Sequence, residues 1–120
     1  MSLIVVINTK TGLATAIQTT LTNAGYTTLI ARDASEAISL IETQSPTLIL
    51  LGDTTHSFHE EIAILRAHSP TTYTAIVLQS DNYILANADY VERLGVAAVL
   101  DNPHSSAQLM QGISEWVKAV

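Results

Sequence analysis

Short apolar runs recur along the chain, and each ends on a polar residue or a glycine. In a parallel sheet, a strand buried on both faces has this form, and a run this short does not suit a helix that buries one stripe. Ligands bind beyond the carboxyl ends of such strands, so the residues that follow the runs are the first candidates for function. The clearest runs are Leu3–Ile7 before Asn8, Leu48–Leu51 before Gly52, Ala75–Leu78 before Gln79, and Ala97–Leu100 before Asp101.

Stretches with helical periodicity separate the apolar runs. Leu13, Ile17 and Leu21 are spaced four apart and predict a helix from Thr11 to Ala24 that Gly25 ends. The alternation of strands and helices predicts a single α/β domain over residues 1–120, with helices on both faces of a parallel sheet. The other predicted elements are a strand at Thr27–Ala31, a helix capped by Asp33 or Ser35, and helices near 58–68, 83–94 and 105–118.

Composition narrows the functions that this domain is expected to have. The chain has 120 residues, is 48% hydrophobic and carries a net charge of −6, without a cluster among its five basic residues. Direct binding to nucleic acid or to an anionic membrane is therefore not expected. The absence of cysteine excludes disulfides and thiolate chemistry. No apolar stretch approaches the ~20 residues of a membrane span, and we expect a cytoplasmic protein.

Motifs that hold phosphates or build a hydrolase are missing. The turn after the first strand, Asn8–Gly12, has a single glycine and so lacks the phosphate cradle of a dinucleotide-binding fold. There is no P-loop and no Gly-x-Ser-x-Gly nucleophile elbow. We therefore do not expect an enzyme, and no catalytic residue is assigned.

Two segments resemble the response-regulator receiver domains, the CheY-like family. Ser45–Leu51 is similar to the segment that leads to the family's phosphorylated aspartate, and Leu94–Pro103 is similar to its Gly-Ala-x-x-Tyr/Phe-Leu-x-Lys-Pro block. The order and lengths of the predicted elements agree along the whole chain. The resemblance implies a flavodoxin/CheY-like (βα)5 three-layer sandwich with the parallel strand order 2-1-3-4-5.

The resemblance also implies a charged site, which this sequence lacks. Receivers use an acidic pair for Mg²⁺, an aspartate as phosphoacceptor, a lysine, a Thr or Ser, and an aromatic switch residue. Only the proline of the block is retained, as Pro103, and a cis bond before it is plausible from the resemblance. The other positions hold Ile7 and Asn8 for the acidic pair, Gly52 for the phosphoacceptor, Asn102 for the lysine, Gln79 for the Thr or Ser, and Val99 for the aromatic residue.

Losing the carboxylates and the lysine together removes the electrostatic stabilisation that phosphoryl transfer requires. The main hypothesis is therefore a pseudo-receiver that signals through protein contacts without aspartate phosphorylation. Under this hypothesis we expect the domain to bind a protein partner or a sister output domain, or to form a homodimer through the face built from the fourth helix, the fifth strand and the fifth helix. Tyr83 and Tyr90, seven residues apart on the fourth helix, are candidate contacts for that face, although such aromatic residues also commonly pack on the sheet.

Two alternatives stay open at this point. In the first, a bulge at Gly52 re-aims Asp53, which then acts as the phosphoacceptor with Mg²⁺ as its cofactor; otherwise no cofactor is expected. In the second, the domain binds a metal or a small ligand through His56, His59 and His104. The simpler interpretation of these histidines is that they are solvated loop residues, and no metal ligand is assigned.

Overall fold

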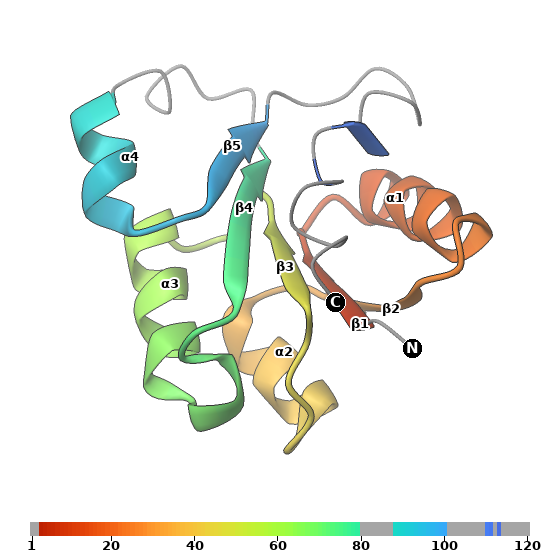
Figure 1. Ribbon diagram of the computed structural model, residues 1–120, viewed down its shortest axis with the longest axis horizontal. Coiled ribbons are helices and arrows are strands. Elements are labelled where there is room, and N and C mark those ends of the chain that lie inside the picture. The colour runs from red at the N-terminus through yellow and green to blue at the C-terminus, as the bar shows by residue number, and fades with distance from the viewer. Residues whose placement is uncertain (1–2, 80–87, 101–109, 112, 114–120) are drawn as a thin grey trace.

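Five parallel strands form one sheet in the order β2-β1-β3-β4-β5 in the computed structural model, as predicted (Figure 1). The structure describes residues 3–79, 88–100, 110–111 and 113. The strands are β1 (Leu3–Ile7), β2 (Thr27–Ala31), β3 (Leu48–Leu51), β4 (Ala75–Gln79) and β5 (Ala98–Leu100). The helices are α1 (Thr11–Asn23), α2 (Ala34–Ile41), α3 (Phe58–Ala67) and α4 (Ala88–Leu94), with a 3₁₀ turn at Ser69–Thr71.

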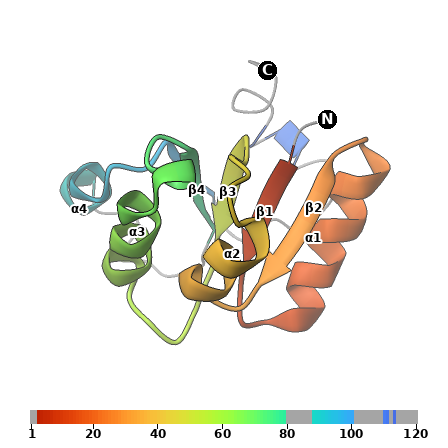
Figure 2. The same cartoon turned by 90° about the horizontal axis from the view of Figure 1, so that it is seen from below.

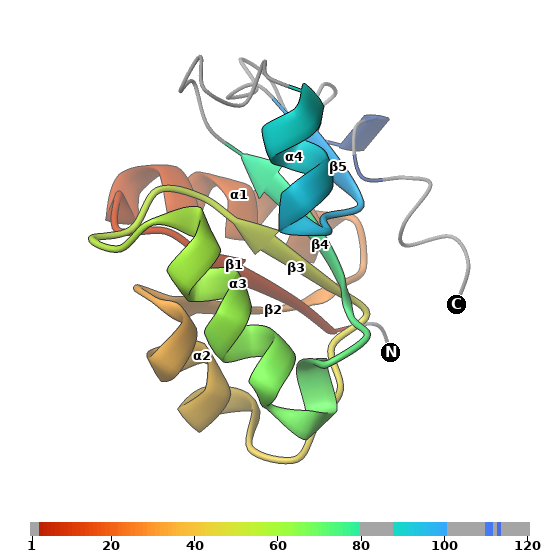
Figure 3. The ribbon, with the colours of Figure 1, turned by 90° about the vertical axis from the view of Figure 1, so that its left-hand side faces the viewer.

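Helices cover both faces of the sheet, which explains why the central strands are apolar throughout. Figure 3 shows α2, α3 and α4 in front of the sheet and α1 behind it. Side chains alternate between the two faces, so each central strand supplies both cores. Ile7, Leu51 and Leu78 belong to the core with α2 and α3. On the other face, Val6, Leu50 and Val77 pack with buried residues of α1 and with Ile113.

Residues at the helix ends act as the sequence predicts. Gly25 follows α1 with a φ of 97°, a conformation that costs glycine little. Asp33, the first of the two predicted caps, accepts a hydrogen bond of 2.8 Å from the Glu36 amide at the start of α2. Ser57, which the sequence analysis did not name as a cap, accepts one of 3.2 Å from the Glu60 amide at the start of α3. These caps fix where the loops between strands and helices begin and end.

Arg66 ties the end of α3 to the turn before β4. Its guanidinium Nη1 donates to the carbonyls of Thr71, Thr72 and Thr74 at 3.1, 3.0 and 2.6 Å. Desolvation by burial lowers the pKa of Arg66 from its usual value. An arginine nevertheless stays charged at ordinary pH, so these are charge-assisted hydrogen bonds that fix the approach to β4.

The predictions for the C-terminal third are tested only in part. The fifth strand begins at Ala98, one residue after the start of the predicted run Ala97–Leu100, and α4 ends before Gly95. In the predicted last helix, 105–118, only Met110, Gln111 and Ile113 are described, and all three are helical. Among the described residues, no helix combines the length and hydrophobicity needed to span a bilayer.

Candidate functional site at the strand ends

Asn8, Gly52 and Gln79 lie in one row at the carboxyl ends of three neighbouring strands. Ile7 of β1 pairs with Leu51 of β3, and Leu51 pairs with Leu78 of β4, so the residues that follow these three are side by side. The ladder continues into this row, because the Gly52 amide donates to the Ile7 carbonyl at 2.7 Å. Three of the residues predicted from the sequence therefore meet at one place.

The side chain of Asn8 occupies the space above Gly52. Asn8 is 2% exposed, and its Oδ1 accepts a hydrogen bond of 2.8 Å from the Lys10 amide. This bond directs the Nδ2 atom toward Gly52, where a Cβ would overlap it and would also lie 3.0 Å from the Asn8 Cγ. Position 52 thus has room for glycine only while Asn8 keeps this conformation. The phosphoacceptor position therefore has no carboxylate, because residue 52 is glycine, and the Asn8 side chain fills the space that a longer side chain would need.

Gln79 brings a second neutral amide to the same row. It is 1% exposed, and its Nε2 finds no hydrogen-bond partner among the described residues. Val99, at the position of the aromatic switch residue, is half-buried and packs against the core beside α2 and α3. Asn102 and Pro103 lie outside the described residues. The part of the site that the structure describes is therefore polar but uncharged at the strand ends.

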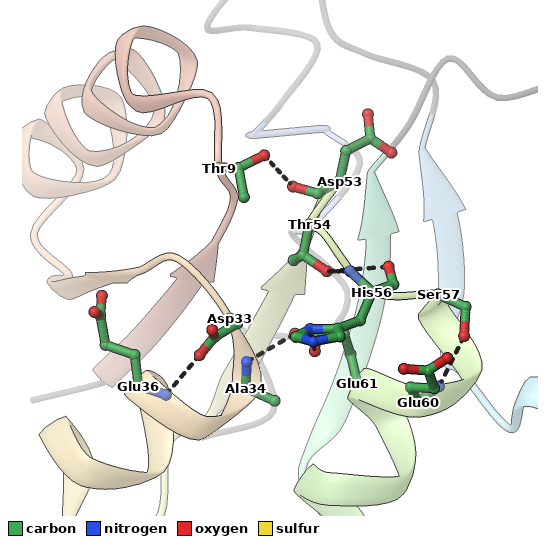
Figure 4. A network of polar contacts seen from close by, with 10 residues as sticks. All are labelled: Thr9, Asp33, Ala34, Glu36, Asp53, Thr54, His56, Ser57, Glu60 and Glu61. Carbon is green, nitrogen blue, oxygen red and sulfur yellow. Dashed lines mark hydrogen bonds and ion pairs between the residues drawn. The ribbon is translucent and has the colours of Figure 1, made fainter.

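Asp53 lies one residue beyond the row and is held by the loop after β1. Its carbonyl accepts hydrogen bonds of 3.0 Å from both the amide and the hydroxyl of Thr9. Figure 4 shows its carboxylate pointing away from Thr9. One carboxylate oxygen lies 3.7 Å from the Lys10 Nζ, and the side chain is 34% exposed. The Gly52 amide keeps its ladder bond to the Ile7 carbonyl, but the next bond, from the Thr9 amide, goes to Asp53, one residue further along than a regular parallel ladder would place it. The role of Asp53 as a phosphoacceptor stays a prediction.

Solved structures with this architecture are numerous, and their similarity spans the whole chain. CheY4, a chemotaxis response regulator of Vibrio cholerae, has a TM-score of 0.84 at 17% identity over 98% of this chain and 99% of its own. A response regulator receiver domain protein from Methanospirillum hungatei JF-1 has a TM-score of 0.82 at 20% identity, over 99% of this chain and 95% of its own. The chain has the CheY-like receiver fold. No protein-family profile matches the sequence, and the comparison with curated proteins gives no match.

A further solved structure with this fold holds a metal ion, which prompts the question of whether the residues described here could hold one. The receiver domain of a sensor histidine kinase from Pseudomonas aeruginosa PAO1 is similar with a TM-score of 0.81 at 18% identity, over 98% of each chain, and has a magnesium ion coordinated in its active-site cleft. Here, Ile7 is fully buried and offers no oxygen, and the Asn8 oxygen already accepts from Lys10. The Asp53 carboxylate faces an ammonium group. Because Mg²⁺ needs oxygen ligands, the described residues do not fit it.

Glu61 is a functional candidate that the sequence analysis missed. This α3 residue is 1% exposed, and its Oε2 accepts a hydrogen bond of 2.7 Å from the Ala34 amide at the start of α2. Its Oε1 lies 3.0 Å from Nδ1 of His56, which is in the loop that carries Asp53 (Figure 4). The sequence held a signal, because Glu61 lies four residues before the apolar Leu65, on the side of α3 that is buried.

His56 is an exposed loop residue, as the simpler interpretation expects, and one side of its ring lies against α3. Its ring is about half exposed, and its Nδ1 lies 3.0 Å from Oε1 of the buried Glu61. His59 is exposed in the first turn of α3, and His104 lies outside the described residues. Within the described ranges, no three His, Asp or Glu side chains come close enough to hold a metal ion.

The predicted tyrosine face is not tested by the structure. Tyr83 lies outside the described residues, and for Tyr90 only the backbone position in α4 is described. The α4–β5 face therefore remains a prediction as a contact surface.

Proposed function

We propose that this chain is a degenerate receiver that acts through protein contacts and is not phosphorylated on aspartate. The observation that carries the proposal is the Asn8 amide in the space above Gly52, at the position where a receiver has its phosphoacceptor. The fold supports a signalling role, and the site has lost the groups that make a receiver respond to phosphate. The net charge of −6 favours a protein partner or a sister domain over nucleic acid.

Energetics support the loss of phosphoryl transfer. This reaction depends on charges arranged around the transferred group, and removing one such contributor commonly costs about 2.7–4 kcal/mol in the barrier. The acidic pair is replaced by Ile7 and Asn8, and the lysine position holds Asn102. Several contributors are therefore lost at once, and Lys10, the one cation near this edge among the residues that the structure describes, faces Asp53.

Asp53 as a displaced phosphoacceptor is the second candidate function. In its favour, Asp53 is partly exposed at the carboxyl edge of the sheet, with Lys10 beside it. Against it, the side chains of Asn8 and Gln79 that share the edge carry no charge and supply no metal carboxylate. A phosphorylated Asp53 would need Mg²⁺ to be held almost entirely by water.

Titration with Mg²⁺ and beryllofluoride, followed by amide chemical shifts, tests the proposal. Beryllofluoride mimics a phosphoryl group on a carboxylate that is supported by Mg²⁺, so we expect no saturable shifts at Asn8, Gly52, Asp53 or Gln79. The variant Asp53→Asn is the control, because it keeps the shape of the side chain without its charge. A stoichiometric change in the wild type that this variant lacks would favour the Asp53 candidate and contradict the proposal.

A further inference from the structure

One continuous segment at an edge of the described structure contains no charged residue. Residues 11–31 contain no Asp, Glu, Lys, Arg or His, whereas the chain as a whole has eleven acidic and five basic residues. This segment forms α1 and β2, which lie together at one margin of the molecule (Figure 2). Threonine dominates its outer surface, and Thr15, Thr19, Thr22 and Thr27 are exposed. We call this surface, formed by α1 and β2, the neutral edge.

The outer strand of the neutral edge has little protection against another strand. β2 ends the sheet and contains neither a proline nor a charged residue, the usual devices that block pairing of an edge. The Ala31 carbonyl accepts a hydrogen bond from the Asn8 amide of β1. Because backbone groups alternate between the two sides of a strand, the N–H and C=O groups of Thr28 and Ile30 point away from β1, toward the open edge. The Thr28 carbonyl accepts one long hydrogen bond of 3.3 Å from Gln18. Among the described side chains, none bonds to the backbone of Ile30.

Side chains form hydrogen bonds to the backbone at both ends of this exposed stretch of β2. At the start, Gln18 of α1 bonds to Thr28, which shows that this side of α1 borders the open edge. At the far end, the Arg32 amide donates to Glu36 at 3.0 Å, and the Arg32 guanidinium pairs with the same carboxylate. The uncovered length is thus short, and it is centred on Ile30.

We propose that two copies of this chain associate through the neutral edge, with their β2 strands antiparallel. The charge of the chain favours this surface for contact between two copies. Two molecules that each have a net charge of −6 repel each other least where neither presents a charged residue. A two-fold axis perpendicular to the sheet pairs β2 with itself and places both α1 helices on the same face, where they become neighbours. This proposal does not rest on the strand-end site, and it holds whether or not Asp53 is phosphorylated.

Sedimentation velocity over a range of protein concentrations and salt tests the association. We expect a monomer–dimer equilibrium that strengthens as salt rises, because salt screens the repulsion between two acidic chains and breaks no ion pair in a neutral interface. Hydrogen exchange at the amides of Thr28 and Ile30 should slow as the dimer forms. A monomer at every concentration and salt, or a dimer that leaves these two amides unprotected, would overturn the proposal.

Charge placed on the neutral edge gives a matched test. Thr15 and Thr22 lie three before and four after Gln18 on the exposed side of α1 that borders β2. The double variant Thr15→Glu, Thr22→Glu should weaken the association about tenfold or more through like-charge repulsion. The double variant Ala63→Glu, Ala67→Glu adds the same two charges to the exposed side of α3 and should leave the association nearly unchanged. Equal weakening by both variants would contradict the neutral edge as the interface, and melting curves confirm that each variant folds.

Discussion

Replacing Glu61 by alanine is expected to lower the free energy of unfolding by about 2–4 kcal/mol. The substitution removes a buried side chain, takes away the acceptor of the Ala34 amide and leaves His56 without its partner. Three elements lose a shared contact, because Glu61 belongs to α3, Ala34 begins α2 and His56 lies in the loop after β3. Urea denaturation measures the loss, and hydrogen exchange should become faster at the Ala34 amide.

Glu60 provides the matched control for Glu61. It is in the same turn of α3 and carries the same charge, but its side chain is exposed. Glu60→Ala should change the free energy of unfolding by no more than about 0.5 kcal/mol. The variant Glu61→Gln keeps an oxygen that accepts from Ala34, so it should be less destabilising than Glu61→Ala. If Glu61→Ala costs no more than Glu60→Ala, the linking role of Glu61 is wrong.

Gly52→Ala is expected to destabilise the protein by about 1–3 kcal/mol, because the new methyl group overlaps the Asn8 amide. Gly12→Ala is the control within the same chain. Position 12 lies in α1, and a Cβ there meets no atom within 4 Å, so this change should be neutral or stabilising. Denaturation curves of the two variants separate a steric effect at position 52 from a general effect of losing glycine.

A double-mutant cycle then identifies Asn8 as the cause of the clash. Asn8→Ala alone should be destabilising, since it removes the acceptor of the Lys10 amide. Combined with Gly52→Ala, it should cost clearly less than the sum of the two single changes, because the methyl group enters the space that Asn8 leaves. Additive free energies would show that Asn8 does not fill the space above Gly52.

The fold was predictable because its signals are local and repeated. The apolar runs at β1, β3 and β4 and the stop at Gly25 each specify an element without reference to the others. The row of Asn8, Gly52 and Gln79 also followed from the sequence, since strand ends of a parallel sheet share one edge. What the sequence did not contain is the packing of the Asn8 amide over Gly52, which depends on a bond to the Lys10 backbone.

Glu61 and His56 show why the rest of the site was harder to predict. Their contact joins the loop after β3 to a buried position of α3 and to the first turn of α2. Such a contact depends on how two helices sit side by side, and no spacing in the sequence encodes this. A glutamate on a buried helical stripe is a usable signal, but it does not name its partner.

Intact-mass measurement after incubation with acetyl phosphate and Mg²⁺ tests the central claim most directly. A site with neutral Asn8 and Gln79 around Gly52 should leave the mass of the wild-type protein unchanged, as in the Asp53→Asn variant. A stoichiometric gain of one phosphoryl group that requires Mg²⁺ and disappears in Asp53→Asn would contradict the claim that this receiver fold has lost aspartate phosphorylation.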